Sequence, residues 1–365
     1  MVFFTRRDLA NPLAGGSEVL VDRLAAGAAD HGHEVCVVAA GPVLRRGYGV
    51  RDGGGPYSQY LRAPLTYLRH HRDADLVVDV ANGLSFFVPL WRRRPAICLV
   101  NHLHTEQWSQ WFSPPIAALG RSLERKGIPK VYRGHLFVAV SRSTAASLEA
   151  IGVHAPQIRV VHNGIDVSDV SESRSPEPLF VCLGRLVPHK RVELVLQAWE
   201  KVRPVVGGRL IIAGDGPERA SLEATAGEAV TFAGQVSEEE KRRLLARAWL
   251  LLHPALVEGW GLVVMEAAVA GTPTVAFDVP GLRDSVLHRR TGLLAQTDAE
   301  FVAYWVSMAS NGLLRARMGQ AARARAATFS WSSSVKQFLL VAQEATLLDG
   351  LPTFPSATVM EERCI

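Results

Sequence analysis

Short, continuous apolar runs alternate along this chain with longer segments in which apolar residues recur at helical spacing. The runs are typical of buried strands, and they cover residues 1–5, 33–40, 75–80, 96–100, 136–141, 179–183 and 249–252. Residues 192–202 and 262–270 are examples of segments predicted to form helices. Residues 41–62 show no clear period and are expected to cover an edge of the first sheet. The alternation predicts an α/β protein with parallel sheets.

The length of 365 residues is sufficient for two α/β domains of ordinary size. Residues 168–178 are rich in Ser, Glu and Pro and lack an apolar period, which predicts a linker. This linker separates an N-terminal domain at residues 1–167 from a C-terminal domain at residues 179–330. A helix is predicted at residues 331–348, and residues 349–365 are predicted to form a disordered tail.

Residues 253–273 carry the strongest chemical signal in the chain. A turn that contains Gly259 and Gly261 follows a buried strand and precedes a helix that Gly271 and Pro273 close. The glycines of the turn let a ligand approach the main chain. Because the first N–H groups of a helix have no partner within the helix, they form a ready site for a phosphate group.

Two carboxylates accompany this turn, Glu258 just before it and Glu266 in the body of the helix. A carboxylate can accept hydrogen bonds from both hydroxyls of a vicinal diol. The pair therefore suits a ligand that has a sugar on each side of a diphosphate. The spacing alone is equally compatible with two glutamates that are merely solvated.

Two cations follow the buried strand at residues 179–183, namely Arg185 and Lys190. Departure of a nucleoside diphosphate from a sugar builds negative charge on the diphosphate. Fixed cations directed at that charge stabilise the transition state and can replace a metal ion. The alternative is that both are surface charges at the start of a helix.

The stretch EGWGLVVMEAAVAGTPTVAF resembles the E-x7-E signature of family 4 retaining glycosyltransferases, with Glu258 and Glu266 as its two carboxylates. The resemblance extends to AGGSE, HNGID, GRLVPHKRVELVLQAWEKV, GLRDSV and TGLLA, which occur in the order found in that family. It implies the GT-B fold, in which two Rossmann-like domains face each other across a cleft. It also implies a metal-independent hexosyltransferase whose N-terminal domain binds the acceptor and whose C-terminal domain binds the nucleotide sugar. The helix at residues 331–348 would cross back to the N-terminal domain.

The resemblance assigns roles to individual residues of the C-terminal domain. Glu266 would bind the donor ribose, and Arg185 and Lys190 would bind the diphosphate. Glu258 and the turn after it would face the donor sugar and phosphate, the turn through the N–H groups of Gly259, Trp260, Gly261 and Leu262. The base would lie against the loop at Gln235 and Val236. No residue stands out as a covalent nucleophile. The resemblance to the family implies a front-face path, in which the departing phosphate helps to take the acceptor proton.

In the N-terminal domain the resemblance indicates the loop at Gly15 and Gly16, which would approach the donor diphosphate and the acceptor. It also indicates a histidine after the strand at residues 96–100, where His102 is preferred to His104. A histidine at such a strand end could equally cap the loop. The preferred donor is a UDP-sugar rather than a GDP-sugar, and no further cofactor is expected.

Aromatic residues Trp108, Trp111 and Phe112 precede a basic run at residues 121–134. This combination suits either a pocket for a soluble acceptor or a peripheral membrane surface that presents a lipid acceptor. It is equally compatible with aromatic side chains packed inside and arginines that are solvated. No helix here combines a clean apolar face with a basic one, so we expect a small soluble acceptor or a natural-product intermediate.

Composition excludes several other classes of protein. With 48% hydrophobic and 21% charged residues the chain is globular, and no apolar run has transmembrane length. Four well-separated cysteines, three of them in strand-like runs, and no signal-peptide pattern favour a reducing cytoplasm. A net charge of +5 favours anionic ligands, but no nucleic-acid motif is present.

Two short motifs predict no ligand. Asp73 and Asp75 form a D-x-D before a buried strand, a position where an acidic residue is common, so no metal site is expected. Gly214 and Gly216 would begin a dinucleotide fingerprint, but Arg219 stands where the third glycine belongs. A GT-B phosphorylase or epimerase and a non-catalytic sugar-nucleotide binding protein remain alternative functions.

Overall fold

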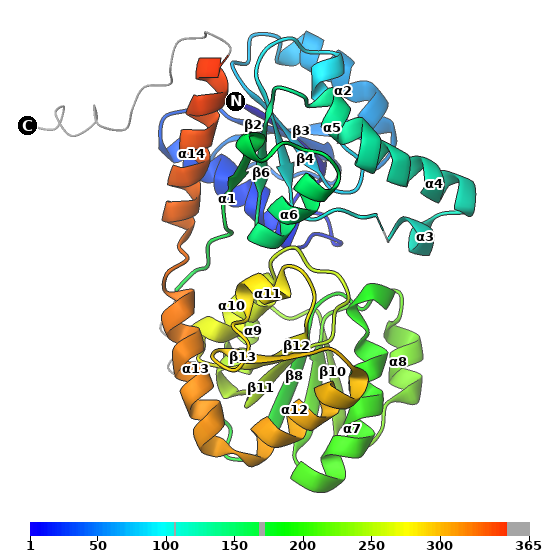
Figure 1. Cartoon of the computed structure of the whole chain (residues 1–365), viewed down its shortest axis with the longest axis vertical. Coiled ribbons are helices and arrows are strands. Elements are labelled where there is room, and N and C mark those ends of the chain that lie inside the picture. The colour runs from blue at the N-terminus through cyan, green and yellow to red at the C-terminus, as the bar shows by residue number, and fades with distance from the viewer. Residues whose placement is uncertain (106, 168–171, 349–365) are drawn as a thin grey trace, which may run out of the picture. The chain divides into compact units, whose positions relative to one another are not determined.

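A computed structural model describes residues 1–105, 107–167 and 172–348, and its chain divides into two compact units. Unit 1 consists of residues 1–164 together with the segment that begins at Trp331, and unit 2 consists of Ile165–Ser330 (Figure 1). The predicted tail lies outside the described residues, and so does the part of the predicted linker at residues 168–171.

Unit 1 is built on one parallel sheet of seven strands in the order β3-β2-β1-β4-β5-β6-β7. Its strands are β1 Val2–Arg7, β2 Cys36–Ala40, β3 Gly49–Gly54, β4 Val77–Ala81, β5 Ala96–Val100, β6 Leu136–Ala139 and β7 Ile158–Val160. Its helices are α1 Gly16–Asp30, α2 Ser58–His70, α3 Trp108–Trp111, α4 Pro114–Ser122, α5 Ile128–Val131, α6 Arg142–Ala150 and α14 Trp331–Leu348. A π-helical turn at Leu123–Gly127 joins α4 to α5.

The sequence analysis missed β3 and α2, because neither shows a clear hydrophobic pattern. β3 is the edge strand of its sheet and reads GVRDGG, with most of its residues exposed or half-buried. An edge strand that is open to solvent needs no apolar run. α2 does have a buried side at Ala63 and Tyr67, but Leu61 and Leu68 are exposed, which obscures the helical period.

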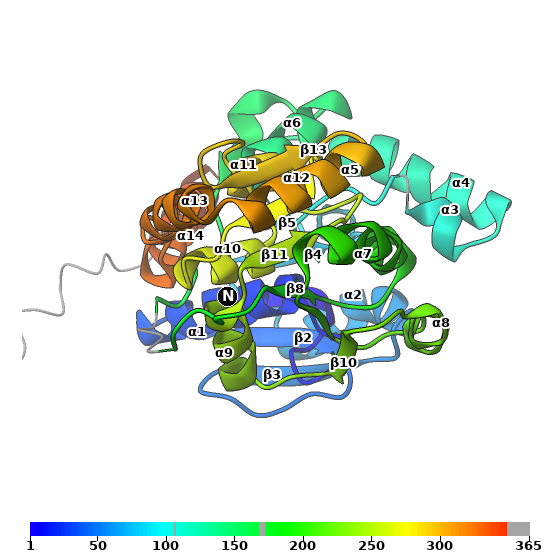
Figure 2. The same ribbon diagram turned by 90° about the horizontal axis from the view of Figure 1, so that it is seen from below.

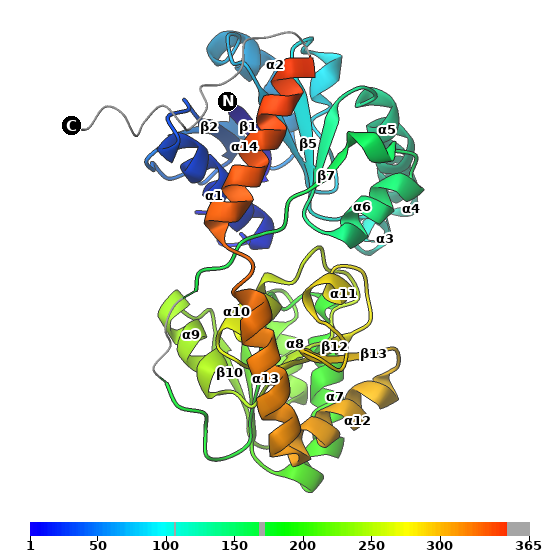
Figure 3. The same cartoon turned by 60° about the vertical axis from the view of Figure 1, so that its left-hand side comes forward.

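The last described helix, α14, packs on α1 although unit 2 separates the two in sequence (Figure 3). A Cβ added at Gly27 of α1 would lie 2.4 Å from the Val335 side chain, so the two helices meet closely at this glycine. The Ser334 hydroxyl donates a hydrogen bond of 2.6 Å to the carbonyl of His162. Arg159 forms an ion pair with Glu344. α14 is thus an integral part of unit 1.

Unit 2 has a parallel six-stranded sheet in the order β10-β9-β8-β11-β12-β13. Its strands are β8 Leu179–Leu183, β9 Arg209–Ala213, β10 Val230–Gly234, β11 Leu250–His253, β12 Thr274–Phe277 and β13 Gly292–Ala295. Its helices are α7 Val192–Val206, α8 Arg219–Thr225, α9 Glu238–Arg247, α10 Leu262–Val269, α11 Leu282–Ser285, α12 Asp298–Ser310 and α13 Gly312–Ala326.

The core of unit 2 contains an aromatic cluster of Phe180, Trp199, Phe301 and Trp305, all fully buried. The rings of Trp199 and Trp305 stack with their centroids 5.6 Å apart, and Phe180 meets both edge-on. This cluster fixes α7 and α12 against one face of the sheet. The loops at the carboxyl ends of the strands therefore stand on a rigid base.

The strand order places a switch point in each sheet. In unit 2 the chain proceeds from β8 to β9 on one side, and β11 lies on the other side of β8. In unit 1 β1 lies between β2 and β4 in the same way. Loops that leave a parallel sheet in opposite directions leave room for a ligand at the carboxyl ends of these strands.

Candidate active site

The candidate site of unit 2 lies where the loops after β8 and β11 separate. The loop after β8 packs closely against the loop after β9, because a Cβ added at Gly214 would lie 1.9 Å from the carbonyl oxygen of Gly184. A Cβ at Gly216 would lie 2.3 Å from the carbonyl oxygen of Leu186. These two glycines allow the two loops to pack closely against each other.

Arg185 follows β8 directly and is half-buried. Its side chain forms no hydrogen bond or ion pair with any residue that the structure describes. A half-buried guanidinium without a carboxylate partner keeps its five N–H groups for a ligand. This is the arrangement expected of a residue that binds phosphate.

Lys190, by contrast, is already paired. Its Nζ lies 2.6 Å from Oε2 of Glu258, and Nε2 of His253 lies 3.2 Å from the same oxygen. Lys190 and Glu258 both have about a fifth or less of their side-chain surface exposed. The structure thus brings together two residues that the sequence indicated, and adds His253, the last residue of β11, which had been given no role.

The charges in this cluster are well defined. Burial would raise the pKa of the Glu258 carboxyl, but the Lys190 ammonium and the bond to His253 outweigh it and hold that pKa well below its ordinary value. Burial lowers the pKa of His253, although Glu258 acts in the opposite direction. Near neutral pH the cluster therefore contains a carboxylate, an ammonium and a neutral imidazole that donates its Nε2–H to the carboxylate.

The turn after Glu258 is held by its backbone. Gly261 has φ +79°, a left-handed conformation that favours glycine, and it is the N-cap of α10. A Cβ added at Gly281 would lie 2.2 Å from the carbonyl oxygen of Glu258, so the loop after β12 packs directly under the turn. The sequence offered Gly281 only as part of the GLRDSV motif, and its supporting role was missed.

Trp260 is buried, and its ring meets Phe329 edge-on with the centroids 5.0 Å apart. Its side chain therefore anchors the turn inside unit 2. Only the backbone of Trp260 remains for a ligand, as for Gly259 and Gly261. The N–H groups at the start of α10, from Leu262 on, lie at the same end of the helix.

Glu266 lies in α10 and is bound through one oxygen only. Its Oε1 lies 2.6 Å from Nζ of Lys241 in α9, whereas its Oε2 is buried and has no hydrogen-bond partner among the residues that the structure describes. Burial raises the pKa of this carboxyl, and Lys241 offsets the effect only in part. A buried acceptor without a donor is costly, so this atom is suited to receive a donor from a ligand. Lys241 itself was missed, because its pairing joins two helices.

The loop at Gln235 and Val236 follows β10 at the same edge of the sheet. Gln235 is exposed and Val236 is half-buried, and the N–H of Gly214 donates to the carbonyl of Gly234 over 2.7 Å. The loop is thus fixed to its neighbour while its tip stays open.

In unit 1 the loop after β1 ends at Gly15, the N-cap of α1, whose N–H donates to the Glu18 carboxylate over 2.8 Å. Gly16 is the first residue of the helix. Asn101, after β5, donates to the Ser17 hydroxyl over 2.9 Å. These contacts bring the carboxyl ends of β1 and β5 together, so both predicted loops of unit 1 lie at one edge of its sheet.

His102 and His104 stack on each other with ring centroids 4.3 Å apart, and Nε2 of His102 lies 3.2 Å from Oε1 of Gln107. Both rings are half-buried, and the preference for His102 stays a prediction. The same loop contacts Glu124, a buried residue of the π-helical turn. Glu124 accepts hydrogen bonds from the N–H of His104 at 2.6 Å and from Thr105 at 3.1 Å.

The three aromatic residues after this loop differ in their surroundings. The ring of Trp108 packs on α4, since a Cβ added at Gly120 would lie 2.4 Å from it, and Phe112 contacts the same ring. Trp111, in contrast, is 52% exposed. α4 also exposes Ile116 and Leu119, which adds apolar surface beside Trp111. α3 and α4 project from the body of unit 1 (Figure 2).

No group of three or more acidic, His or Cys side chains within the described residues could hold a metal ion. Cys98 and Cys182 are buried free thiols of β5 and β8, whereas Cys36 is only half-buried. Within the same part of the chain, no helix is both long and apolar enough to cross a membrane.

Comparison with known proteins extends over most of the chain. Residues 14–169 match the family model "Glycosyltransferase Family 4", and residues 166–325 match the model "Glycosyl transferases group 1". The structure of the Anabaena protein HepE in complex with UDP and glucose superposes with a TM-score of 0.75 at 17% identity, covering 94% of this chain and 99% of that one. The predicted GT-B fold of two Rossmann-like domains is thereby confirmed.

Two curated relatives have named substrates. A D-inositol 3-phosphate glycosyltransferase of Mycobacteroides abscessus is 28% identical over 287 residues, which are 63% of each chain. A GDP-mannose-dependent alpha-(1-6)-phosphatidylinositol monomannoside mannosyltransferase of Mycobacterium tuberculosis is 35% identical over 130 residues, 32% of this chain and 34% of that protein. The chain thus spans somewhat less than two thirds of the length of the first relative.

The stability of the protein should depend on pH through Glu124, which binds the loop after β5 at His104 and Thr105. Burial raises the pKa of its carboxyl to about 7, despite the hydrogen bonds from His104, Thr105 and Trp108. The group is protonated more readily in the folded protein than in the unfolded chain, where its pKa is about 4.3. Its contribution to stability is therefore complete below the unfolded pKa and is lost as the pH rises through 7.

We expect the stability of the parent relative to Glu124→Gln to fall by up to about 3 kcal/mol between pH 4 and pH 8. Urea unfolding of both proteins at a series of pH values measures this. Glu149→Gln, at an exposed position of α6, is the matched control and should show no such trend. A constant difference between parent and Glu124→Gln would contradict the expected titration.

Proposed function

This chain belongs to the glycosyltransferases that join a family 4 domain to a group 1 domain, and we propose that it transfers a sugar from a nucleoside diphosphate donor to a hydroxyl of a small polyol. The anomeric configuration would be retained and no metal ion would be needed. Unit 2 would bind the donor, and the loops after β1 and β5 of unit 1 would bind the acceptor.

One observation carries the donor half of the proposal: the buried Oε2 of Glu266 has no hydrogen-bond partner within the described part of the chain. Lys241 occupies the other carboxylate oxygen and fixes its direction. A ribose 2′- or 3′-hydroxyl would supply the missing donor to Oε2. Because hydrogen bonds to the charged form stabilise it, donor binding would also lower the raised pKa of Glu266.

The diphosphate would lie between the free guanidinium of Arg185 and the N-terminus of α10. The N–H groups after Gly261 and the positive end of the helix dipole favour a phosphate there. As the bond to the sugar breaks, negative charge grows on the diphosphate, and donors fixed in advance stabilise it without rearrangement.

Glu258 would act as an anchor for the donor sugar. Lys190 and His253 keep it ionised, and both hold the same oxygen, Oε2. Within the described residues its Oε1 accepts one long bond of 3.3 Å, from the N–H of Gly259, and it can also accept a sugar hydroxyl. In a front-face reaction the departing phosphate takes the acceptor proton, so this pathway needs no protein base.

The proposed acceptor is a cyclitol or cyclitol phosphate. The M. abscessus relative is named for an inositol phosphate, and a small hydrophilic acceptor agrees with the polar loops at Gly15, Asn101 and His102. UDP is the first donor nucleotide to test. GDP is the alternative, since the M. tuberculosis relative is named for GDP-mannose.

Replacing Glu266 by Gln should weaken nucleoside diphosphate binding by about tenfold or more, because a hydrogen bond to a charged group contributes roughly 1.5–3 kcal/mol. Calorimetric titration with UDP and with GDP measures the effect and identifies the base. Glu238→Gln is the control, since Glu238 also pairs with Lys241 but is exposed. Equal affinity of Glu266→Gln and the parent would refute the ribose role.

The two cations after β8 should respond differently to removal. Arg185→Ala should lower turnover by about two to three decades with little loss of stability, because its side chain has no partner among the described residues. Lys190→Ala should also lose turnover. In addition its free energy of unfolding should fall by on the order of 3 kcal/mol, because Glu258 would stay buried without its cation.

Steady-state kinetics and thermal unfolding separate the two effects. Arg209→Ala, at an exposed position of β9, is the matched control for lost charge. Activity should survive EDTA. Full turnover of Arg185→Ala would refute the proposed diphosphate site, and loss of activity in EDTA with recovery in magnesium would refute metal independence.

A second candidate function is transfer to a lipid acceptor at a membrane surface. It is favoured by the exposed apolar residues Trp111, Ile116 and Leu119, which lie beside a basic segment with exposed Arg125 and Lys126. The phosphatidylinositol in the name of the M. tuberculosis relative points the same way. Each such cation contributes about 1 kcal/mol of attraction to an anionic surface.

Sedimentation with anionic and neutral vesicles distinguishes the two acceptor classes. For a soluble acceptor we expect the protein to stay in the supernatant with both. Salt-sensitive binding to anionic vesicles, lost in Ile116→Asp/Leu119→Asp but kept in Leu313→Asp, would establish the lipid surface instead. Leu313 of α13 is 87% exposed, so Leu313→Asp places an aspartate at an exposed leucine position outside unit 1 and serves as the control.

A further inference from the structure

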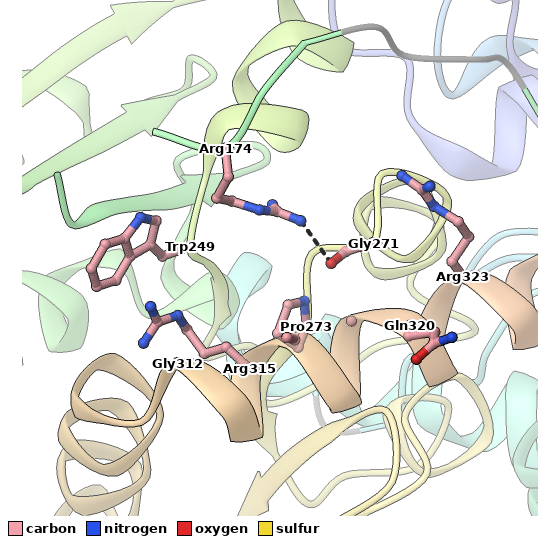
Figure 4. Close-up of a pocket in the computed structure, with 10 residues that line it drawn as sticks. Arg174, Trp249, Gly271, Pro273, Gly312, Arg315, Gln320 and Arg323 are labelled. Atoms are coloured by element: carbon pink, nitrogen blue, oxygen red, sulfur yellow. Dashed lines mark hydrogen bonds between the residues drawn. The ribbon is translucent and has the colours of Figure 1, made fainter. Parts of the chain in front are cut away.

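Unit 2 contains a cavity of about 440 Å³ at the amino ends of β11 and β12, the edge of the sheet opposite the proposed donor site. It lies between the C-terminal end of α10 and one side of α13 (Figure 4). Its lining residues are Arg174, Trp249, Gly271, Pro273, Gly312, Arg315, Ala316, Gly319, Gln320 and Arg323. Cavities of this volume are typical of small-molecule sites.

The cavity has a strong excess of positive charge. Three of its ten lining residues are arginines and none is acidic. Arg174 comes from the segment before β8, and Arg315 and Arg323 come from α13 (Figure 4). Burial lowers the pKa of the Arg174 guanidinium, and the nearby charges of Arg323 and Arg315 lower it further.

Each guanidinium is held in place by neutral groups. Nη2 of Arg174 donates to the carbonyl of Gly271 at 2.8 Å. Nη1 of Arg315 donates to the carbonyls of Met308 and Ala309, and its guanidinium lies 3.8 Å from the centre of the Trp249 ring.

Arg323 is held through one atom only, since its Nε donates to the carbonyl of Val269 at 3.1 Å. Both Nη atoms of Arg323 and Nη2 of Arg315 have no hydrogen-bond partner among the described residues. The arginines are thus oriented, but their hydrogen-bonding capacity is not used up.

Capping of α10 accounts for only part of this arrangement. Cations near the C-terminal carbonyls of a helix are stabilising, and Arg174 and Arg323 both bind there. Capping does not require Arg315, which binds the end of α12 instead. It also does not explain an open cavity whose walls bring three like charges together at an electrostatic cost.

The walls of the cavity cannot easily collapse onto the charges. α13 crosses the end of α10 at Gly319, where an added Cβ would lie 2.1 Å from the carbonyl oxygen of Gly271. The two backbones are therefore already in contact beside the cavity. The three arginines line the space beside this contact.

We propose that this cavity binds a small phosphate-bearing anion, either pyrophosphate or a phosphate monoester. A phosphate group near neutral pH carries close to two charges and three acceptor oxygens, which matches planar guanidinium donors approaching from two sides. The volume exceeds that of a lone phosphate and leaves space for a second phosphate or a small organic group against Trp249. This site is separate from the donor site and does not depend on the proposed activity.

Calorimetric titration with pyrophosphate and with glycerol phosphate tests this site in the full chain. The titrations use an Arg185→Ala background, so that binding of the probes at the proposed donor site is weakened. Arg315→Gln/Arg323→Gln removes two of the three charges. Arg317→Gln, on the same helix but not among the lining residues, removes the same kind of charge as the matched control.

We expect one equivalent of pyrophosphate or glycerol phosphate to bind, with affinity at least tenfold weaker in Arg315→Gln/Arg323→Gln and unchanged in Arg317→Gln. The single variant Arg323→Gln, which loses only one internal hydrogen bond, should fold and show an intermediate affinity. Equal affinity in all variants, or an equal loss in Arg317→Gln, would overturn the site. Citrate binding as tightly as pyrophosphate would overturn the assignment to phosphate.

Discussion

The strand order of the two sheets is the constraint on which the candidate site depends. In each sheet the chain moves outward from a central strand in both directions, so the loops after β8 and β11 in unit 2 part at their carboxyl ends. That single feature places Arg185, Lys190 and the Glu258 turn at one edge. It also explains why residues separated by some 70 positions in sequence can form an ion pair of 2.6 Å.

At this edge of the sheet the carboxyl groups of Glu258 and Glu266 have pKa values shifted in opposite directions. Both pair with a lysine at 2.6 Å, yet the pKa of Glu258 is held well below its ordinary value and that of Glu266 is raised. The difference lies in the remaining partners, because Glu258 also binds His253 whereas Glu266 has a buried oxygen for which the described residues supply no partner. Glu258 is held as a carboxylate by Lys190 and His253 at one of its oxygens. The proposed ribose hydroxyl would supply the hydrogen-bond donor that Oε2 of Glu266 lacks among the described residues.

The sequence was sufficient for the α/β class, most buried strands and the turn at residues 258–261, because each has a local pattern. It was not sufficient for Lys241, His253 and Gly281. Their roles arise from contacts between elements, and nothing in their spacing shows which carboxylate or carbonyl they meet. β3 was missed for a different reason, since a polar edge strand carries no hydrophobic signal. The sequence also did not show that Ile116 and Leu119 of α4 are exposed, because apolar residues in a helix ordinarily predict a buried face.

The net charge of +5 indicates anionic ligands in general, but paired cations contribute little to their binding. Lys190 and Lys241 are neutralised by glutamates, and Arg46 by Asp8. The cations that attract anions are those without a carboxylate, and in unit 2 they include Arg185 at one edge of the sheet and Arg315 and Arg323 at the other. α10 lies between these two edges, with its positive end at the Glu258 turn and its negative end capped by Arg174 and Arg323. The capping arginines satisfy the helix with only part of their donors, and the donors left over give the cavity its affinity for a phosphate.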